Sequence, residues 1–281
     1  MAPTPSTNTT LRILLVTDLH MNLDNIKKLG KDIINANEKL DYILCSGDIS
    51  NFDPDDYGME GEAEKTAACE GEMSAAIIEL DNIHKDTFYI PGNHDSKTSL
   101  LNPVNERPQL TTFSTNVHKR CIRLAPDLVL MGLGGSLPGY RDGKQHWVGY
   151  PYQTDEQLSV DLHVTYKEAQ SGADPILKDT DSILLMTHVG PHSSSTAIDR
   201  LHTDQSPIMS GSKAIEQFII DHTKVFLNVH GHTHFAPGMT NYGKAAVINA
   251  GPLKFDRYAL ITIEKHVNAG WRLLSSEFKT L

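Results

Sequence analysis

The sequence predicts a layered α/β domain with sheets in the middle and helices outside. Two observations predict it: short apolar runs alternate with helical patterns in the first half of the chain, and strand patterns follow one another after residue 245. No linker divides residues 11–281, so we expect a single domain there. Residues 1–10, MAPTPSTNTT, are small, polar and proline-containing, and we expect them to form a disordered tail.

The first half contains three predicted strands and two predicted helices. Each strand is a short run rich in branched apolar residues, and these runs are residues 11–18, 41–48 and 87–95. Apolar side chains near helical spacing predict a helix over residues 22–40. Met73 and Ile77 share one face of a second predicted helix.

The second half begins with a predicted hairpin over residues 120–136, which ends in glycines. Thr154 and Gln157 form the capping box of a predicted helix. Ser212 is the predicted N-cap of a helix over residues 213–222. The remaining predicted elements are strands, at residues 182–188, at residues 225–232, and three more within residues 245–278.

Composition and charge exclude several classes of protein. Lys plus Arg number 25 and Asp plus Glu 35, and the resulting formal charge of −10 repels nucleic-acid backbones, so we expect no nucleic-acid partner. No apolar run approaches the roughly 20 residues of a membrane helix, and the first residues lack a secretory signal. The three cysteines fit neither a disulfide framework nor a CxxC motif, which favours a reducing, cytoplasmic location.

Five of the predicted strands end in residue types that bind metal ions. In chain order these are Asp18 and His20, then Asp48, then Asn93 and His94, then His188, and finally His232 and His234. Ligands of open α/β sheets lie outside the carboxyl ends of the strands, so we expect the five ends to converge on one crevice. A single histidine at a strand end is more often an ordinary packed residue, but five such ends in one chain are improbable by chance.

The donor set predicts the kind of metal. It combines imidazole nitrogens with carboxylate and amide oxygens and contains no thiolate, which suits Mn²⁺, Fe²⁺/³⁺, Zn²⁺ or Co²⁺ better than Ca²⁺ or a structural zinc site. There are more ligands than one tetrahedral ion accepts. Two divalent ions that share a carboxylate are the simplest solution.

The same residues carry a family resemblance. The motifs DLH (18–20), GD (47–48), GNHD (92–95), the lone His188 and GHTH (231–234) occur in this order, and the pattern resembles the calcineurin-like metallophosphoesterase superfamily over about residues 11–265. The resemblance implies a four-layer αββα sandwich, in which two mixed sheets are flanked by helices.

The resemblance also implies a role for each motif residue. It implies that one metal is held by Asp18, His20 and His234, that the other is held by Asn93, His188 and His232, and that Asp48 bridges them. His94 is the implied catalytic residue that reaches the substrate. Asp95 is the implied second catalytic residue, which orients His94 by taking its other ring hydrogen. His230 lies outside the motif, and we expect it to be structural.

The implied function is hydrolysis of a phosphomonoester or phosphodiester of a small substrate, with a nucleotide-like compound as one candidate. A hydroxide that bridges the two ions would attack the phosphorus. One alternative is a phosphoprotein phosphatase, which ranks lower because the sequence shows no inserted domain or basic groove to seat a peptide. The other alternative is a catalytically weak scaffold of the same fold that binds protein partners. The complete ligand set is an argument against the scaffold.

Three segments are candidates for the rim of the site. Residues 51–64 hold six acidic residues and no basic one, which favours a solvated surface loop. Residues 136–152 carry Arg141 and Trp147, which we expect to contact substrate unless this loop packs on its own aromatic residues. Residues 190–212 follow His188 and carry His192, for which a pocket position and an exposed one are equally expected.

Overall fold

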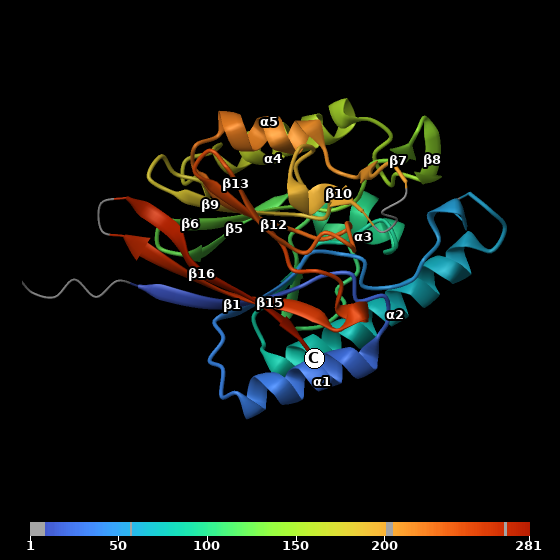
Figure 1. Ribbon diagram of the computed structural model, residues 1–281, viewed down its shortest axis with the longest axis horizontal. Helices are drawn as coiled ribbons and strands as arrows, with labels where there is room; N and C mark the ends of the chain where they lie inside the picture. Colours follow the sequence, from blue (N-terminus) through green and yellow to red (C-terminus); the bar gives the residue numbers. More distant parts are fainter. Residues whose placement is uncertain (1–8, 57, 201–204, 267–268) are drawn as a thin grey trace, which may run out of the picture.

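The protein is a stack of two sheets between two layers of helices (Figure 1). The computed structural model describes residues 9–56, 58–200, 205–266 and 269–281. Helices α4 and α5 lie along the top of Figure 1 and α1 and α2 along the bottom, with the sheets between them. This arrangement confirms the predicted four-layer αββα sandwich.

The first sheet has six strands, of which four consecutive ones run parallel. In spatial order it consists of β16 (Gly270–Thr280), β15 (Arg257–His266), β1 (Thr10–Val16), β2 (Tyr42–Cys45), β3 (Thr87–Tyr89) and β4 (Ser114–Asn116). Strands β1 to β4 pair in parallel, while β15 pairs antiparallel with β1 and β16 antiparallel with β15. The predicted strand over residues 41–48 is therefore shorter than expected, because the chain leaves the sheet after Cys45.

The second sheet also has four parallel strands, but with an antiparallel strand at each edge. In spatial order it consists of β13 (Gly238–Tyr242), β14 (Ala245–Asn249), β12 (Val225–His230), β9 (Ser182–Thr187), β6 (Leu128–Leu133) and β5 (Arg120–Ala125). Strands β14, β12, β9 and β6 pair in parallel, and the two outer strands are antiparallel to their neighbours. Each sheet therefore presents the carboxyl ends of several parallel strands at one edge.

Alternating side chains fill three separate cores. On β1, Ile13 faces the other sheet, whereas Leu14 faces helices α1 (Leu23–Asn35) and α2 (Glu62–Ile83). On β9, Leu184 faces the first sheet, whereas Leu185 faces α4 (Asp155–Ala169) and α5 (Lys213–Asp221). Each of these four side chains is fully buried and stabilises the fold by about 1.5–3 kcal/mol. Burial on both faces explains why these strands are continuous apolar runs.

The helix termini follow their sequence signals. The Thr154–Gln157 capping box is formed at the start of α4, and the Ser212 side chain accepts the Ile215 N–H at the start of α5. Helix α1 ends at Asn35 rather than near residue 40, because Asn37 adopts a left-handed backbone conformation with φ of 50°. The short helices are α3 (Lys97–Leu101), η1 (Pro54–Asp56), η2 (Val104–Glu106), η3 (Ser195–Ala197) and η4 (Leu253–Phe255).

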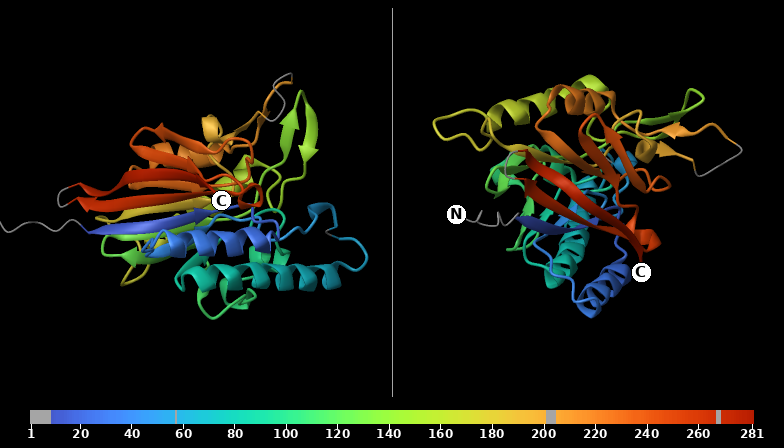
Figure 2. Two further views of the ribbon diagram at one scale, coloured as in Figure 1. Left: turned by 60° about the horizontal axis from the view of Figure 1, so that its bottom comes forward. Right: turned by 60° about the vertical axis from the view of Figure 1, so that its left-hand side comes forward.

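A small third sheet covers one end of the sandwich, and we call it the cap sheet. It consists of β10 (Ile198–Asp199), β11 (Ile208–Met209), β7 (Gly139–Arg141) and β8 (Lys144–Trp147). The green β7–β8 hairpin stands away from the rest of the sandwich in the left view of Figure 2. Its strands come from two of the predicted rim segments and were not predicted as strands, because segments of two to four residues carry no usable periodicity. Strand β4, of three residues, was missed for the same reason, and β13, of five residues, was missed as well.

Two further expectations concern the N-terminal tail and membrane-spanning helices. Of the predicted tail over residues 1–10, residues 1–8 lie outside the described residues, and β1 already begins at Thr10, which pairs with Glu264. Within the described residues, no helix combines the length and the apolar character needed to cross a bilayer.

Candidate metal centre

The predicted ligands meet where the parallel strands of both sheets end. Asp18 and His20 follow β1, Asp48 follows β2, His188 follows β9, and the GHTH motif follows β12. Donor atoms of two residue groups each lie within 4.8 Å of one another, and these groups are Asp18, His20, Asp48 and His234, and Asp48, His188 and His232. Because the sheets face each other, ends that are far apart in sequence converge on one edge.

Asp48 is the member that both groups share. Its Oδ2 lies 3.7 Å from Nε2 of His20, and its Oδ1 lies 3.4 Å from Nε2 of His188. The His94 backbone N–H donates to Oδ1 over 2.9 Å, which fixes the carboxylate between the groups. This geometry suits a carboxylate that bridges two cations.

Asp18 links the turn after β1 to the turn after β12. Its Oδ1 lies 3.1 Å from Nε2 of His234, and its Oδ2 accepts the backbone N–H of His232 at 3.1 Å. The Thr17 hydroxyl donates to the same Oδ2 over 2.8 Å. Asp18 therefore holds the GHTH turn against the first sheet and keeps one oxygen next to His234.

Hydrogen bonds at the outer ring nitrogens aim the histidines inward. Nδ1 of His20 lies 2.9 Å from Oδ1 of Asn51, and Nδ1 of His188 lies 2.7 Å from the Ser46 carbonyl. An Nδ1 that donates to an oxygen leaves Nε2 with its lone pair, the form that binds a metal. Four buried inward atoms have no hydrogen-bond partner among the described residues, namely Nε2 of His20, His188 and His232 and Oδ1 of Asn93.

The backbone around the cluster is strained. Four of the predicted ligands have positive φ, namely Asp18, His20, Asp48 and His232. Non-glycine residues rarely adopt this conformation, and such strain concentrates at functional sites. Two glycines permit the close approach: a Cβ on Gly92 would lie 2.1 Å from Oδ1 of Asp48, and a Cβ on Gly231 would lie 1.7 Å from Oγ1 of Thr17.

Burial and charge set the protonation of the cluster. Burial lowers the pKa of His232 to about 3, with a further lowering from His188, so His232 is neutral. Burial opposes a charge on His188 too, but the Asp48 carboxylate outweighs it and raises the pKa of His188 to about 9. A divalent cation that binds here would displace the His188 proton, as metal ligation by imidazole requires.

His94 and Asp95 are arranged differently from the expectation. Nδ1 of His94 lies 2.7 Å from the Phe52 carbonyl, so a backbone oxygen rather than Asp95 takes the second ring hydrogen. Asp95 is turned under the loop, where Oδ1 accepts the Ile49 N–H at 2.9 Å and Oδ2 accepts the Gly92 N–H at 2.7 Å. The Asp95 carboxylate is occupied by three backbone N–H groups, those of Ile49, Ser50 and Gly92, and this explains why it is turned away from the His94 ring.

The donor chemistry fits the expected pair of ions. Buried donor atoms without hydrogen-bond partners are satisfied when a cation coordinates them, and the two carboxylates supply the negative charge that cations need. Cysteine takes no part, since Cys45, Cys69 and Cys121 lie buried in other places as free thiols. The residues present therefore fit two divalent ions with nitrogen and oxygen ligands.

A cavity of about 150 Å³ opens beside the cluster. Its lining combines predicted ligands with residues of the cap sheet, and consists of Asp48, Asn93, His94, Trp147, Asp199, Ser210, His232, Thr233 and His234. Trp147 forms one wall, with its ring centroid 5.3 Å from that of His232. Its Nε1 donates to the Leu137 carbonyl over 3.0 Å, and a Cβ on Gly139 would lie 2.1 Å from the indole, so the ring is held in place.

Two of the predicted substrate contacts do not line this cavity. Arg141 bonds through Nη1 to Gln205, because the cap sheet brings the rim segment of residues 190–212 alongside β7. The backbone N–H of His192 donates to the Ser212 carbonyl, and the Ser212 N–H donates to the Gly190 carbonyl. The ring Nδ1 of His192 lies 3.3 Å from the Gly211 carbonyl. Trp147 therefore lies at the cavity, while the substrate contacts of all three residues stay predictions.

Several residues of the site were missed in the sequence. Asn51 holds His20 from both sides, because its Oδ1 faces Nδ1 and its Nδ2 donates to the His20 carbonyl over 3.0 Å. Asn51 stands three residues after the GD motif, and that proximity was its only signal. Asp199 and Ser210 reach the cavity from the cap sheet and had no local signal at all.

His230, which lies outside the motif, ends β12 as a buried structural residue. Its Nε2 lies 2.8 Å from the Thr196 hydroxyl, and Asn249 donates to the Thr196 carbonyl over 3.1 Å. Burial lowers the pKa of His230 to about 4, so it stays neutral. This network ties the segment before the cap sheet to the second sheet.

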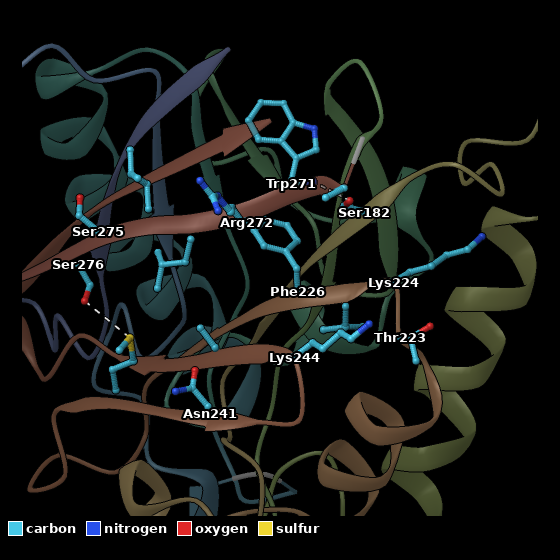
Figure 3. Close-up of a pocket in the computed structure, with 16 residues that line it drawn as sticks. Ser182, Thr223, Lys224, Phe226, Asn241, Lys244, Trp271, Arg272, Ser275 and Ser276 are labelled. Atoms are coloured by element: carbon cyan, nitrogen blue, oxygen red, sulfur yellow. Dashed lines mark hydrogen bonds between the residues drawn. The ribbon is translucent and has the colours of Figure 1, made fainter. Parts of the chain in front are cut away.

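The largest cavity described has a volume of about 670 Å³, and Figure 3 shows the side chains that line it. It is lined by the residues that begin β9 and β12, Ser182 and Val225, whereas the ligands follow the ends of these strands. Two of its cations are paired, Arg272 with Glu264 and Lys224 with Asp179. No predicted ligand lines it, so its size does not make it the catalytic site.

The comparisons with known proteins agree with this geometry. The family model described as calcineurin-like phosphoesterase matches residues 11–236. No curated protein matches the chain.

Three solved structures have the same fold. The protein TT1561 of Thermus thermophilus is 18% identical, with a TM-score of 0.58 over 97% of this chain and 99% of that one. A dimetal phosphatase from Danio rerio is 12% identical, with a TM-score of 0.54 over 96% and 98%. The NAD nucleotidase of Haemophilus influenzae is 10% identical, with a TM-score of 0.51 over 98% of this chain and 50% of that one.

Proposed function

This chain belongs to the calcineurin-like phosphoesterase family, and from that premise we propose that it is a hydrolase of small phosphoesters that uses two divalent metal ions. The observation that carries the proposal is the set of inward donor atoms around Asp48. Four of these atoms are buried without a hydrogen-bond partner among the described residues. Such atoms are costly in a folded protein unless a ligand satisfies them.

We propose that Asp18, His20, Asp48 and His234 hold one ion and that Asp48, Asn93, His188 and His232 hold the other. When bound, the ions supply Lewis acidity and an activated water for attack on phosphorus. Manganese, iron and zinc each match the donor set.

The remaining residues orient the substrate and move a proton. The Phe52 carbonyl fixes the ring of His94, which lines the cavity and leaves Nε2 to serve the phosphoester. A proton on this Nε2 would be donated to the leaving oxygen as it gains negative charge. Asp95 keeps the loop of His94 in place by accepting its backbone N–H bonds. In this scheme Asp95 is a positioning residue.

The cavity favours a small substrate over a phosphoprotein. A volume of about 150 Å³ beneath the cap sheet leaves room for a phosphate group and a small alcohol part. Trp147 offers an apolar wall, on which a ring of the alcohol part would pack. Three buried free cysteines support a cytoplasmic location as part of this proposal.

The test is a panel of substrates and metals. We expect metal-loaded protein to hydrolyse at least one of p-nitrophenyl phosphate, its bis-ester, cyclic nucleotides or nucleoside diphosphates, with Mn²⁺, Fe²⁺, Zn²⁺ or Mg²⁺ supplied separately. Metal content, measured by mass spectrometry on the same samples, should approach two ions per chain. Hydrolysis of no substrate, with weak or partial metal occupancy, would instead support the scaffold alternative.

A further inference from the structure

A polar pocket of about 300 Å³ lies at the outer edge of the first sheet, beside the edge strand β4. Arg107 and Arg120 both line it, together with the amide side chains of Asn105 and Gln109 and the hydroxyl of Thr115. Among the described residues that line it, none is acidic and none belongs to the metal centre. The pocket is therefore separate from the proposed active site and carries a concentrated positive charge.

Backbone carbonyl groups hold both guanidinium groups at this pocket. Arg107 donates through Nε to the Asn102 carbonyl over 3.0 Å and through Nη1 to the His118 carbonyl. Arg120 donates through Nη1 to the Asn116 carbonyl over 3.2 Å. The acceptors at residues 116 and 118 are only two positions apart. Each guanidinium group has five N–H donors, so most donors of the pair remain for another partner.

The two arginines lack the negative charge that balances other arginines of this chain. Arg12, Arg123 and Arg272 form ion pairs with carboxylates, whereas no ion pair within the described residues involves Arg107 or Arg120. Burial lowers the pKa of the Arg107 guanidinium, and the charge of Arg120 lowers it further. Adjacent like charges that are partly shielded from water are unfavourable unless an anion joins them.

We propose that Arg107 and Arg120 bind an oxyanion in this pocket, either a phosphate or a carboxylate group of a small molecule. Guanidinium groups bind both kinds of group through paired hydrogen bonds. Asn105 and Gln109 supply further amide donors at the rim. A volume of about 300 Å³ is at the small end of ligand pockets, which suits a compact anion.

The test is calorimetric titration of the metal-loaded protein at low ionic strength, with inorganic phosphate in one arm and succinate in the other. Arg120→Gln removes one guanidinium group that makes a single known hydrogen bond. Lys244→Gln is the control, because it removes the same charge from an exposed residue on another part of the surface. We expect Arg120→Gln to weaken one binding event about tenfold or more and Lys244→Gln to leave it unchanged.

A second variant, Arg107→Lys, keeps the charge but loses the planar fork, and we expect intermediate binding from it. Phosphate can also bind at the metal centre, so the expected result in that arm is that Arg120→Gln weakens one binding event about tenfold or more, to the point of loss from the titration, and leaves any other event as in the parent. Loss of only the phosphate event assigns a phosphate ligand, and loss of only the succinate event assigns a carboxylate ligand. Equal titrations of Arg120→Gln and Lys244→Gln in both arms would overturn the proposal. Binding is read without turnover, so this result is independent of the proposed hydrolysis.

Discussion

The change Asp48→Asn tests the shared carboxylate most directly. The His94 N–H donates to Oδ1 over 2.9 Å and requires an acceptor there, so the amide oxygen of the variant will take the Oδ1 position. The amide NH₂ will then replace Oδ2, which faces Nε2 of His20 at 3.7 Å. An amide nitrogen that carries two hydrogens has no lone pair for a metal. The ligand group that contains His20 therefore loses the oxygen of residue 48, whereas the group that contains His188 keeps an oxygen of residue 48.

The expected magnitude follows from this asymmetry. Loss of an outer-shell partner alone weakens metal binding by about 10–100-fold, so loss of a direct ligand with its negative charge should exceed about 100-fold. Metal content should fall from about two ions per chain towards one, with the His188 group still loaded. Turnover should fall by at least about 100-fold, because one of the two ions that stabilise the developing charge is missing.

The assay is metal analysis after dialysis together with steady-state hydrolysis of the best substrate of the panel. Asp199→Asn is the matched control: it makes the same chemical change in the wall of the same cavity, outside the ligand groups, and should keep both ions. If Asp48→Asn retains two ions and parental turnover, the shared-ligand reasoning is wrong.

Three further predictions follow from the same contacts. His94→Ala should keep its metal but lose about 100-fold or more in turnover, and parental turnover would exclude His94 as the proton donor. Gly92→Ala should lose metal, since its Cβ would lie 2.1 Å from Oδ1 of Asp48. The control is Gly71→Ala in α2, where nothing lies within 4 Å of the added Cβ. This variant should keep its metal and have a slightly higher free energy of unfolding. Burial, followed by neighbouring cations, holds the pKa of His118 well below its usual value, so His118 is neutral when folded and its unfolded form takes up a proton near pH 6.5. His118 should therefore contribute up to about 1.4 kcal/mol per pH unit to the fall in the free energy of unfolding in urea below pH 6.5, beside the contributions of the other buried neutral histidines, and an equally steep fall in His118→Gln would show that His118 is not a source of the slope.

The sequence alone identified the residues that gather at the centre, and the reason is local. Each predicted ligand follows a buried apolar strand, and a strand can be recognised from its own residues. Once the strands run parallel, their carboxyl ends must share an edge, so the convergence of Asp18 and Asp48 within the first sheet needed no knowledge of the packing between the sheets, whereas the approach of His188 from the second sheet depends on that packing.

The partners of those residues were decided only by tertiary structure. The carbonyl of Phe52 holds His94, and Asp95 instead serves backbone donors of the loop below it. Backbone groups are the same at every position, so a sequence gives no sign of which carbonyl will meet a given ring. Arg141 was diverted to Gln205 because two short segments paired into the cap sheet, and pairing of that kind depends on long-range contacts rather than on local periodicity.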